Sequence, residues 1–417
     1  MRSNRFPVSL TAALAILFAM SFATTVAAAP TETILYKFSG TDGNSPHSTL
    51  IFDAAGNLYG TTEVGGLYDG GTVFELTPGT GGVWTQKVLY SFHKYGNGGR
   101  YPEGSLVFDT AGNLYGTTQQ GGPNNAGTVF ELTPGTGGIW TETTLHRFNI
   151  KDGYSPWAAL IFDKSGNLFG TTEYGGNHNN GVIFELSPKS GGGWSEKLLH
   201  TFNHPHSHSP DGAQPMAELM FDALGNLYTT TFGGGPGPVG TVVELTPHPG
   251  ANWTEAVIDS FGGLHTARNP AAGLVSDATG NLYGTTKGGG GHCNCGTVFE
   301  LTPQSGGGWA ETRLFAFGNT SGAEPTASLI FDANGNLYGT ATGSGAYQQG
   351  TVFELMPAAG GTWTETVLHD FKNDGTDGNQ PRGGLVFDSS GNLYGTTGYG
   401  GNTACQLGCG TIFKITP

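Results

Sequence analysis

The segment FDAAGNLYGTT at residues 52–62 decides the fold, because close copies of it occur seven times along the chain. Each copy has Gly-Asn followed by Leu and an aromatic residue, and successive copies lie 54 to 59 residues apart. The marking asparagines are Asn57, Asn113, Asn167, Asn226, Asn281, Asn336 and Asn392. One proline keeps the same register in every copy, as Pro46, Pro102, Pro156, Pro215, Pro270, Pro325 and Pro381. Two independent markers with one period indicate a tandem repeat of structural units.

Each copy contains the pattern of four short strands. In the first copy, we expect the strands at residues 50–53, 58–62, 72–77 and 84–92, separated by turns rich in Gly, Asn and Pro. The third strand carries apolar residues on both faces, so both of its faces must be buried, and no segment has helical periodicity. Four antiparallel strands per repeat predict an all-β, seven-bladed β-propeller.

The two ends of the chain complement each other. The seventh copy stops after its third strand, at residues 411–417, and lacks a fourth. Residues 31–38, TETILYKF, match the fourth strand of the sixth copy, TETVLHDF at 364–371. We therefore expect the N-terminal strand to complete the last blade, which closes the ring and leaves no exposed sheet edge.

The N-terminus has the features of a secretory signal. Arg2 and Arg5 precede an apolar run at residues 8–22, and small residues at 26–28 suit cleavage after Ala28. We expect a signal peptide at 1–28 and one propeller domain at 29–417, with an uncleaved N-terminal anchor as the minor alternative. The expected location is outside the cytoplasm of a bacterium, as a secreted, periplasmic or cell-surface protein, with no stable membrane span after cleavage.

The charge of the chain excludes one class of partner. The formal net charge is −15, and removal of the two signal arginines makes it −17. A surface this acidic repels phosphate backbones, so nucleic acid is not an expected partner.

The repeated motif also resembles a known family. FDxxGNLYGTT, then Gly-Gly, then GTVFELTP, is similar to the GloVer-type tandem repeat of choice-of-anchor proteins, and the similarity covers nearly all of residues 31–417. The resemblance implies an exported bacterial protein, often held by a C-terminal anchor, and this sequence shows no anchor segment. It implies no activity, and no cofactor is expected.

Residues present in nearly every copy are interpreted as structural, because one ring rarely needs seven identical sites. An aspartate before each turn should accept backbone N–H groups, and a glutamate in the third strand should bond nearby polar groups. The aspartates are Asp53, Asp109, Asp163, Asp222, Asp277, Asp332 and Asp388, and the glutamates are Glu75, Glu131, Glu185, Glu244, Glu300 and Glu354. Six fourth-strand tryptophans, from Trp84 to Trp363, are expected to be packing anchors.

Residues that depart from the repeat are better functional candidates. Export favours disulfides, so we expect two bridges within loops between second and third strands. They pair Cys405 with Cys409 and Cys293 with Cys295, the second bridge being the tighter, with metal binding around His292 as a distant alternative. The alternating His204, His206 and His208 form a weak candidate site for Zn²⁺ or Cu²⁺.

Aromatic residues mark the loops that should share one face of the ring. They are Tyr68, Tyr101, Tyr154, Trp157, Tyr174, Phe232, Tyr347 and Tyr399. Exposed rings suit stacking on sugars or contact with a protein, although the same rings could simply cover the blade ends.

These features favour a non-enzymatic binding or scaffold module with a glycan or a cell-surface protein as ligand. The alternative is a propeller-type lyase or hydrolase acting on an extracellular polysaccharide or lactone. Its candidate residues are Glu63, Glu173 and Lys287, at equivalent positions after the second strand of three copies.

Overall fold

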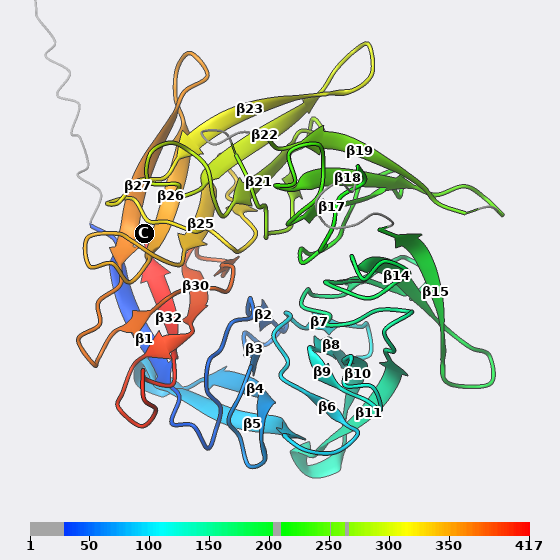
Figure 1. The fold of residues 1–417 in the computed structure, drawn as a ribbon. Coiled ribbons are helices and arrows are strands. Elements are labelled where there is room, and N and C mark those ends of the chain that lie inside the picture. Colours follow the sequence, from blue (N-terminus) through cyan, green and yellow to red (C-terminus); the bar gives the residue numbers. More distant parts are fainter. Residues whose placement is uncertain (1–28, 203–209, 251, 263–266) are drawn as a thin grey trace, which may run out of the picture.

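Seven four-stranded antiparallel sheets surround a central channel in the computed structural model (Figure 1). The structure describes residues 29–202, 210–250, 252–262 and 267–417, so the predicted signal peptide and the His204–His208 tract lie outside the described residues. The seven-bladed propeller predicted from the repeat is confirmed. No helix among the described residues has the length and apolar character that crossing a membrane requires.

Within each blade the first strand lies nearest the channel and the fourth strand lies at the rim (Figure 1). Blade 1 contains β2 (Ile51–Phe52), β3 (Leu58–Thr62), β4 (Asp69–Pro78) and β5 (Trp84–His93). Blade 2 contains β7 (Val107–Phe108), β8 (Leu114–Thr118), β10 (Thr128–Pro134) and β11 (Trp140–Arg147). Blade 3 contains β12 (Ile161–Phe162), β13 (Leu168–Thr172), β14 (Val182–Pro188) and β15 (Trp194–Thr201). Blade 4 contains β16 (Met220–Phe221), β17 (Leu227–Thr231), β18 (Thr241–Thr246) and β19 (Thr254–Ser260).

Blade 5 contains β20 (Val275–Ser276), β21 (Leu282–Thr286), β22 (Thr297–Pro303) and β23 (Trp309–Ala316). Blade 6 contains β24 (Ile330–Phe331), β25 (Leu337–Ala341), β26 (Thr351–Pro357) and β27 (Trp363–Asp370). Blade 7 contains β29 (Val386–Phe387), β30 (Leu393–Thr397), β32 (Thr411–Thr416) and β1 (Thr31–Lys37). Two short strand pairs join loops outside the blade sheets. They are β6 (Gly99–Arg100) with β9 (Gln120–Gly121), and β28 (Gly378–Asn379) with β31 (Tyr399–Gly400). Two 3₁₀ turns, Thr80–Gly82 and Thr136–Gly138, precede β5 and β11.

The N-terminal strand closes the ring as predicted. β1 pairs antiparallel with β32, from Thr31 opposite Thr416 to Lys37 opposite Thr411. Phe38, which follows β1, is fully buried and packs edge-to-face on Phe74 of blade 1, with their ring centroids 5.1 Å apart. The first and last segments of the chain therefore share one blade and one core.

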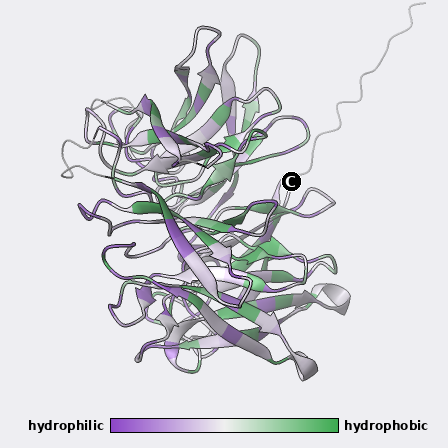
Figure 2. Ribbon diagram, turned by 90° about the vertical axis from the view of Figure 1, so that its right-hand side faces the viewer, coloured by the Kyte–Doolittle hydropathy of each residue, from purple (hydrophilic) through white to green (hydrophobic). Residues whose placement is uncertain are grey.

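Small residues inside the blades make room for large ones. In most blades the second strand has a glycine opposite a third-strand phenylalanine, as in Gly170 and Phe184. A Cβ atom on Gly170 would lie 2.6 Å from Cζ of Phe184, so a side chain there collides with the ring. Blade 4 exchanges both residues together, with Thr229 opposite Val243. Figure 2 shows hydrophobic residues interspersed along the strands of the stacked sheets.

The repeat markers hold neighbouring blades together. Each register proline packs against a glycine of the preceding blade that in most blades comes directly before the third strand. A Cβ on Gly127 would lie 2.6 Å from Cδ of Pro156. In most blades a second-strand threonine donates to a carbonyl of the next blade, as Thr171 does to Ala217 at 3.1 Å. These contacts explain why proline, glycine and threonine recur at fixed positions.

The recurring aspartates, glutamates and tryptophans have the structural roles predicted for them. Oδ1 of Asp53 accepts the N–H groups of Ala55 and Asn57, and the hydroxyl of Tyr59 bonds both Asp53 and Glu75. The tryptophans pack on the second-strand aromatic of the preceding blade, as Trp194 does on Tyr115.

Candidate functional site

A cavity of about 540 Å³ occupies the central channel. Three consecutive residues from each blade line most of it, and these residues lie between the register proline and the first strand. Residues that follow the second strand complete the lining, together with Gln214 and Glu324, which precede the register proline. Loop residues, and not the strands themselves, therefore form the wall of the cavity.

An unusual backbone conformation brings these residues to the channel. The residue before each register proline has a positive φ of 53 to 62°, which is uncommon for residues other than glycine. These residues are Ser45, Tyr101, Ser155, Gln214, Asn269, Glu324 and Gln380. In blade 3 the N–H of Ser155 bonds the carbonyl of Ala126 in blade 2, and its carbonyl accepts the N–H of Glu173. The same pair of bonds occurs in all seven blades, so each proline is fixed and the residue after it faces the channel.

The residue after the proline differs in every blade. The set is His47, Glu103, Trp157, Met216, Ala271, Thr326 and Arg382, and all seven line the cavity. Sequence reasoning singled out only Trp157 among them. The sequence does contain a signal for the other six: the residue directly after each register proline differs in every copy, although the residues around it repeat.

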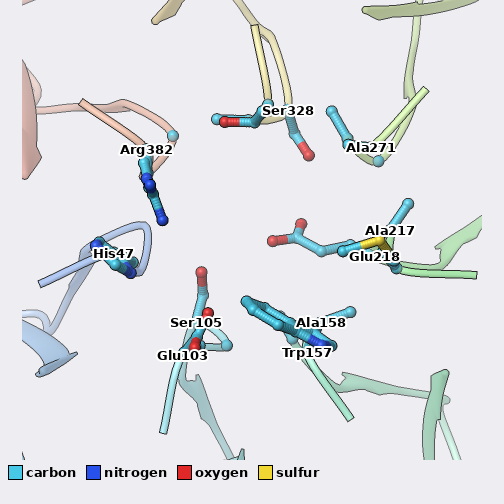
Figure 3. Close-up of a pocket in the computed structure, with 18 of the residues that line it drawn as sticks. His47, Glu103, Ser105, Trp157, Ala158, Ala217, Glu218, Ala271, Ser328 and Arg382 are labelled. Carbon is cyan, nitrogen blue, oxygen red and sulfur yellow. The ribbon is translucent and has the colours of Figure 1, made fainter. Parts of the chain in front are cut away.

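Three aromatic residues cluster on the side of the cavity formed by blades 3 and 4. They are Trp157, Tyr174 and Phe232. Nε1 of Trp157 donates to Oε2 of Glu173 at 2.6 Å, and Nε2 of Gln214 donates to the hydroxyl of Tyr174 at 3.2 Å. These bonds fix two of the rings without covering their faces, and Figure 3 shows Trp157 lying along the edge of the cavity.

Carboxyl groups surround the same space. Burial raises the pKa of Glu218, whose side chain points into the cavity from blade 4 (Figure 3). Burial, and then the nearby Glu63 and Glu173, raise the pKa of Glu103 well above its ordinary value. Burial also raises the pKa of Glu173, although hydrogen bonds from Tyr174, Trp157 and Ser155 oppose the rise. Crowded carboxyl groups of this kind hold protons more tightly than exposed ones.

Arg382 of blade 7 and His47 of blade 1 line the opposite side of the cavity, and Lys287 lines it in blade 5. Arg382 points toward the cavity from across the channel relative to Glu218 (Figure 3). His47 lies 3.6 Å from Oε2 of Glu63, but burial and the nearby Arg382 lower the pKa of this histidine to about 3, so it is neutral at ordinary pH. Lys287 pairs with Glu324 at 3.3 Å. Four glutamates and two cationic side chains line the cavity, so its charge does not favour anionic ligands.

The structure separates the remaining aromatic candidates from this cavity. Tyr154 stands beside Tyr174 with ring centroids 5.9 Å apart, outside the lining. Tyr68 stacks on His93, and Tyr347 is half exposed with Lys372 over its ring. Arg100 lies over Tyr101, and Tyr399 lines a separate hollow of about 410 Å³. Three of the eight predicted aromatics therefore meet at one site.

The candidates of the enzyme hypothesis also lie near the channel. Glu173 and Lys287 line the cavity, and Glu63 lies beside His47. Among the described residues, the cavity carboxylates do not gather into a three-ligand group of the size that holds a metal ion. Disulfides join Cys405 to Cys409 and Cys293 to Cys295 in loops away from the cavity lining.

The fold and the cavity together define a seven-bladed propeller with a polar, partly aromatic pocket in its channel. The chain belongs to the Gloeobacter/Verrucomicrobia repeat family, whose sequence profile matches residues 15–237 and 214–417. No curated protein matches the chain.

Several solved structures have a similar fold. An ancestral GH74 enzyme has a TM-score of 0.57 and 13% identity, and the match covers 91% of this chain and 49% of that one. The extracellular domain of a putative one-component system from B. thetaiotaomicron has a TM-score of 0.50 and 12% identity, covering 91% of this chain and 40% of that one. A luciferin-regenerating enzyme has a TM-score of 0.45 and 15% identity, covering 76% of this chain and 91% of that one. The chain thus spans less than half of the first two proteins, and such identities show the fold alone.

Proposed function

We propose that the protein is an exported binding module that holds a neutral saccharide in the central channel. The observation that carries the proposal is the meeting of Trp157, Tyr174 and Phe232 with carboxyl groups in one cavity. Aromatic faces stack on the apolar faces of sugar rings, and carboxylates accept hydrogen bonds from sugar hydroxyls. The cavity volume of about 540 Å³ is that of a small-molecule site and suits a short oligosaccharide or the end of a longer chain.

Two features support sugar binding over contact with a protein. The aromatic residues lie in a concave channel, whereas protein interfaces bury broad surfaces. The residues of the cavity vary between blades while their backbone scaffold stays constant, so the ring presents one asymmetric site instead of seven equal ones. The expected signal peptide and the two disulfides agree with an exported protein.

The test is calorimetric titration with a panel of neutral oligosaccharides of several linkages. Replacing Trp157 with Ala removes a stacking face that we expect to contribute about 2 kcal/mol, so affinity should fall roughly 30-fold. Tyr347→Ala is the control, because Tyr347 is a half-exposed aromatic of a loop between second and third strands that lies outside the cavity. Equal losses in both variants, or a panel without any binding sugar, would refute the proposal.

A second candidate function is cleavage of the bound saccharide. The raised pKa of Glu103, caused by burial and neighbouring carboxyl groups, is the property that a general acid needs. Release of reducing ends or unsaturated products by the wild type, abolished in Glu103→Gln with binding retained, would establish catalysis. Binding without turnover in the wild type leaves the binding module as the function.

A further inference from the structure

Two blade junctions contain a His–Asp–Glu group away from the channel. Between blades 2 and 3, His146 of β11 faces Asp152 of the connecting loop and Glu196 of β15. Between blades 6 and 7, His369 of β27 faces Asp377 and Glu32 of β1. None of these side chains lines the cavity of the candidate saccharide site.

The geometry points to metal binding: we propose that each of these two junctions binds one divalent transition-metal ion, such as Zn²⁺. Nε2 of His146 lies 3.8 Å from Oδ2 of Asp152 and 3.8 Å from Oε1 of Glu196. In each group the three ligand atoms lie within 4.8 Å of one another. At the junction of blades 2 and 3, an ion equidistant from the three atoms and in their plane lies about 2.2 Å from each if the third separation is also 3.8 Å, and about 2.5 Å if it is 4.8 Å. These values lie at or somewhat above the upper end of zinc–ligand distances.

The groups contain buried polar atoms that the protein leaves unsatisfied. The side chains are only 9 to 18% exposed. Nε2 of His146, Oε1 of Glu196 and Oε1 of Glu32 have no hydrogen-bond partner among the described residues. At the junction of blades 2 and 3, both separations of 3.8 Å are too long for hydrogen bonds, so a protonated His146 would not satisfy both carboxylates. At the junction of blades 6 and 7, His369 bonds Oδ2 of Asp377 at 3.3 Å, whereas Oε2 of Glu32 lies 3.8 Å away. A metal ion would satisfy all three ligands at once.

Neighbouring groups hold the ligands in position. Oδ1 of Asp152 accepts the N–H of Asn149 at 2.6 Å, and the amide of Asn149 also bonds this carboxylate. Oδ1 of Asp377 accepts the N–H of Gly378 at 2.6 Å, and the ring of His369 packs edge-to-face on Phe371. Such support orients metal ligands in proteins.

The seven repeats provide an internal comparison. Histidine occupies this fourth-strand position in three copies, and in each of these the loop has Asp and the next blade has Glu. At the junction of blades 7 and 1, Tyr36 takes the position of the histidine and bonds Asp42 directly at 2.5 Å, while Gln86 replaces the glutamate. The histidine therefore never occurs without the Asp and the Glu, although the Glu also occurs in copies that lack the histidine, such as Glu365. The third set, at the junction of blades 3 and 4, borders residues 203–209, which lie outside the described residues, so the proposal concerns two junctions.

The test uses the full-length mature protein with His204, His206 and His208 replaced by Ser, so that this tract cannot supply metal. After chelation and dialysis, calorimetric titration with ZnCl₂ should show at least two equivalents, and elemental analysis should find them after desalting. His146→Gln combined with His369→Gln should remove two equivalents. Glu196→Gln combined with Glu32→Gln, which preserves side-chain shape, should weaken those two sites at least tenfold.

Glu365→Gln is the matched control. Glu365 occupies the same strand position as Glu196, but Phe315 stands where the histidine would be, so zinc binding should not change. Fewer than two equivalents in the parent protein would overturn the proposal. Stoichiometry that is unchanged in both double variants, with native circular dichroism, would also overturn it.

Discussion

The substitution Phe38→Ala tests whether the two ends of the chain close the ring. Phe38 is fully buried, follows β1, and belongs to a core that includes Phe74 and Leu58 of blade 1 and Ile412 of β32. Truncation of a fully buried phenylalanine to alanine costs about 3–5 kcal/mol through lost burial and a residual cavity. For a chain of about 390 residues, an unfolding entropy near 0.8 kcal/mol/K converts this cost into a fall in Tm of about 4–6 °C.

Phe148→Ala is the matched control for Phe38→Ala. Phe148 holds the equivalent position at the junction of blades 2 and 3, where the chain is continuous, and it packs on Phe184 with the same 5.1 Å centroid separation. Differential scanning calorimetry of both variants should give similar decreases in Tm. If Phe148→Ala lowers Tm while Phe38→Ala leaves it unchanged, β1 does not belong to the closed ring and the reasoning fails.

Two further predictions concern the repeat itself. Gly170→Thr should destabilise the protein by about 1–3 kcal/mol, because the new side chain collides with Phe184. Adding Phe184→Val should recover part of this loss, because blade 4 contains the same Thr–Val pair. Denaturant unfolding of the single and double variants measures both effects, and additive losses would contradict the prediction. Burial alone would raise the pKa of Asp109, but hydrogen bonds from Asn113, Ala111 and Tyr115 lower this pKa overall. The ionised carboxylate therefore stabilises the fold above the unfolded pKa near 4, and this stabilisation is lost as the pH falls through the folded pKa. The stability difference between wild type and Asp109→Asn should therefore be largest at pH 7 and shrink below pH 4, and a difference independent of pH would contradict this.

The fold was predictable because each repeat marker has a structural task that leaves few alternatives. Pro156 and Gly127 contact each other across a junction, Gly170 makes room for Phe184, and Thr171 bonds the next blade. Seven repetitions made these constraints visible in a single sequence. The boundaries were less certain: β2 spans two residues where four were expected, and β4 begins at Asp69, before a shift in register.

The candidate site was predictable only in part. Trp157, Tyr174 and Phe232 were chosen as loop aromatics, but Glu103, Glu218 and Arg382 were not singled out. Their direction depends on the positive φ of the residue before the proline, and that residue is Ser, Tyr, Gln, Asn or Glu in different copies. The residue type before the proline does not predict the positive φ, because hydrogen bonds from its backbone to the neighbouring blade impose this conformation.

Some aromatic residues that were predicted for the site lie outside the cavity. Tyr68 and Tyr347 occupy loops between second and third strands, as Tyr174 does. Tyr174 lines the channel, whereas Tyr68 and Tyr347 lie farther along their loops and stay half exposed. Tyr399 has the same offset from its second strand as Tyr174 but lines a separate hollow, so the offset alone does not identify the residue that reaches the channel.

A crystal structure of the protein with its best-binding oligosaccharide tests the central claim most directly. We predict a sugar ring stacked on Trp157 inside the channel, with hydroxyl groups within hydrogen-bond distance of Glu218 or Arg382. Sugar density over Tyr68 or Tyr347 at the rim, with the channel free of it, would contradict the account.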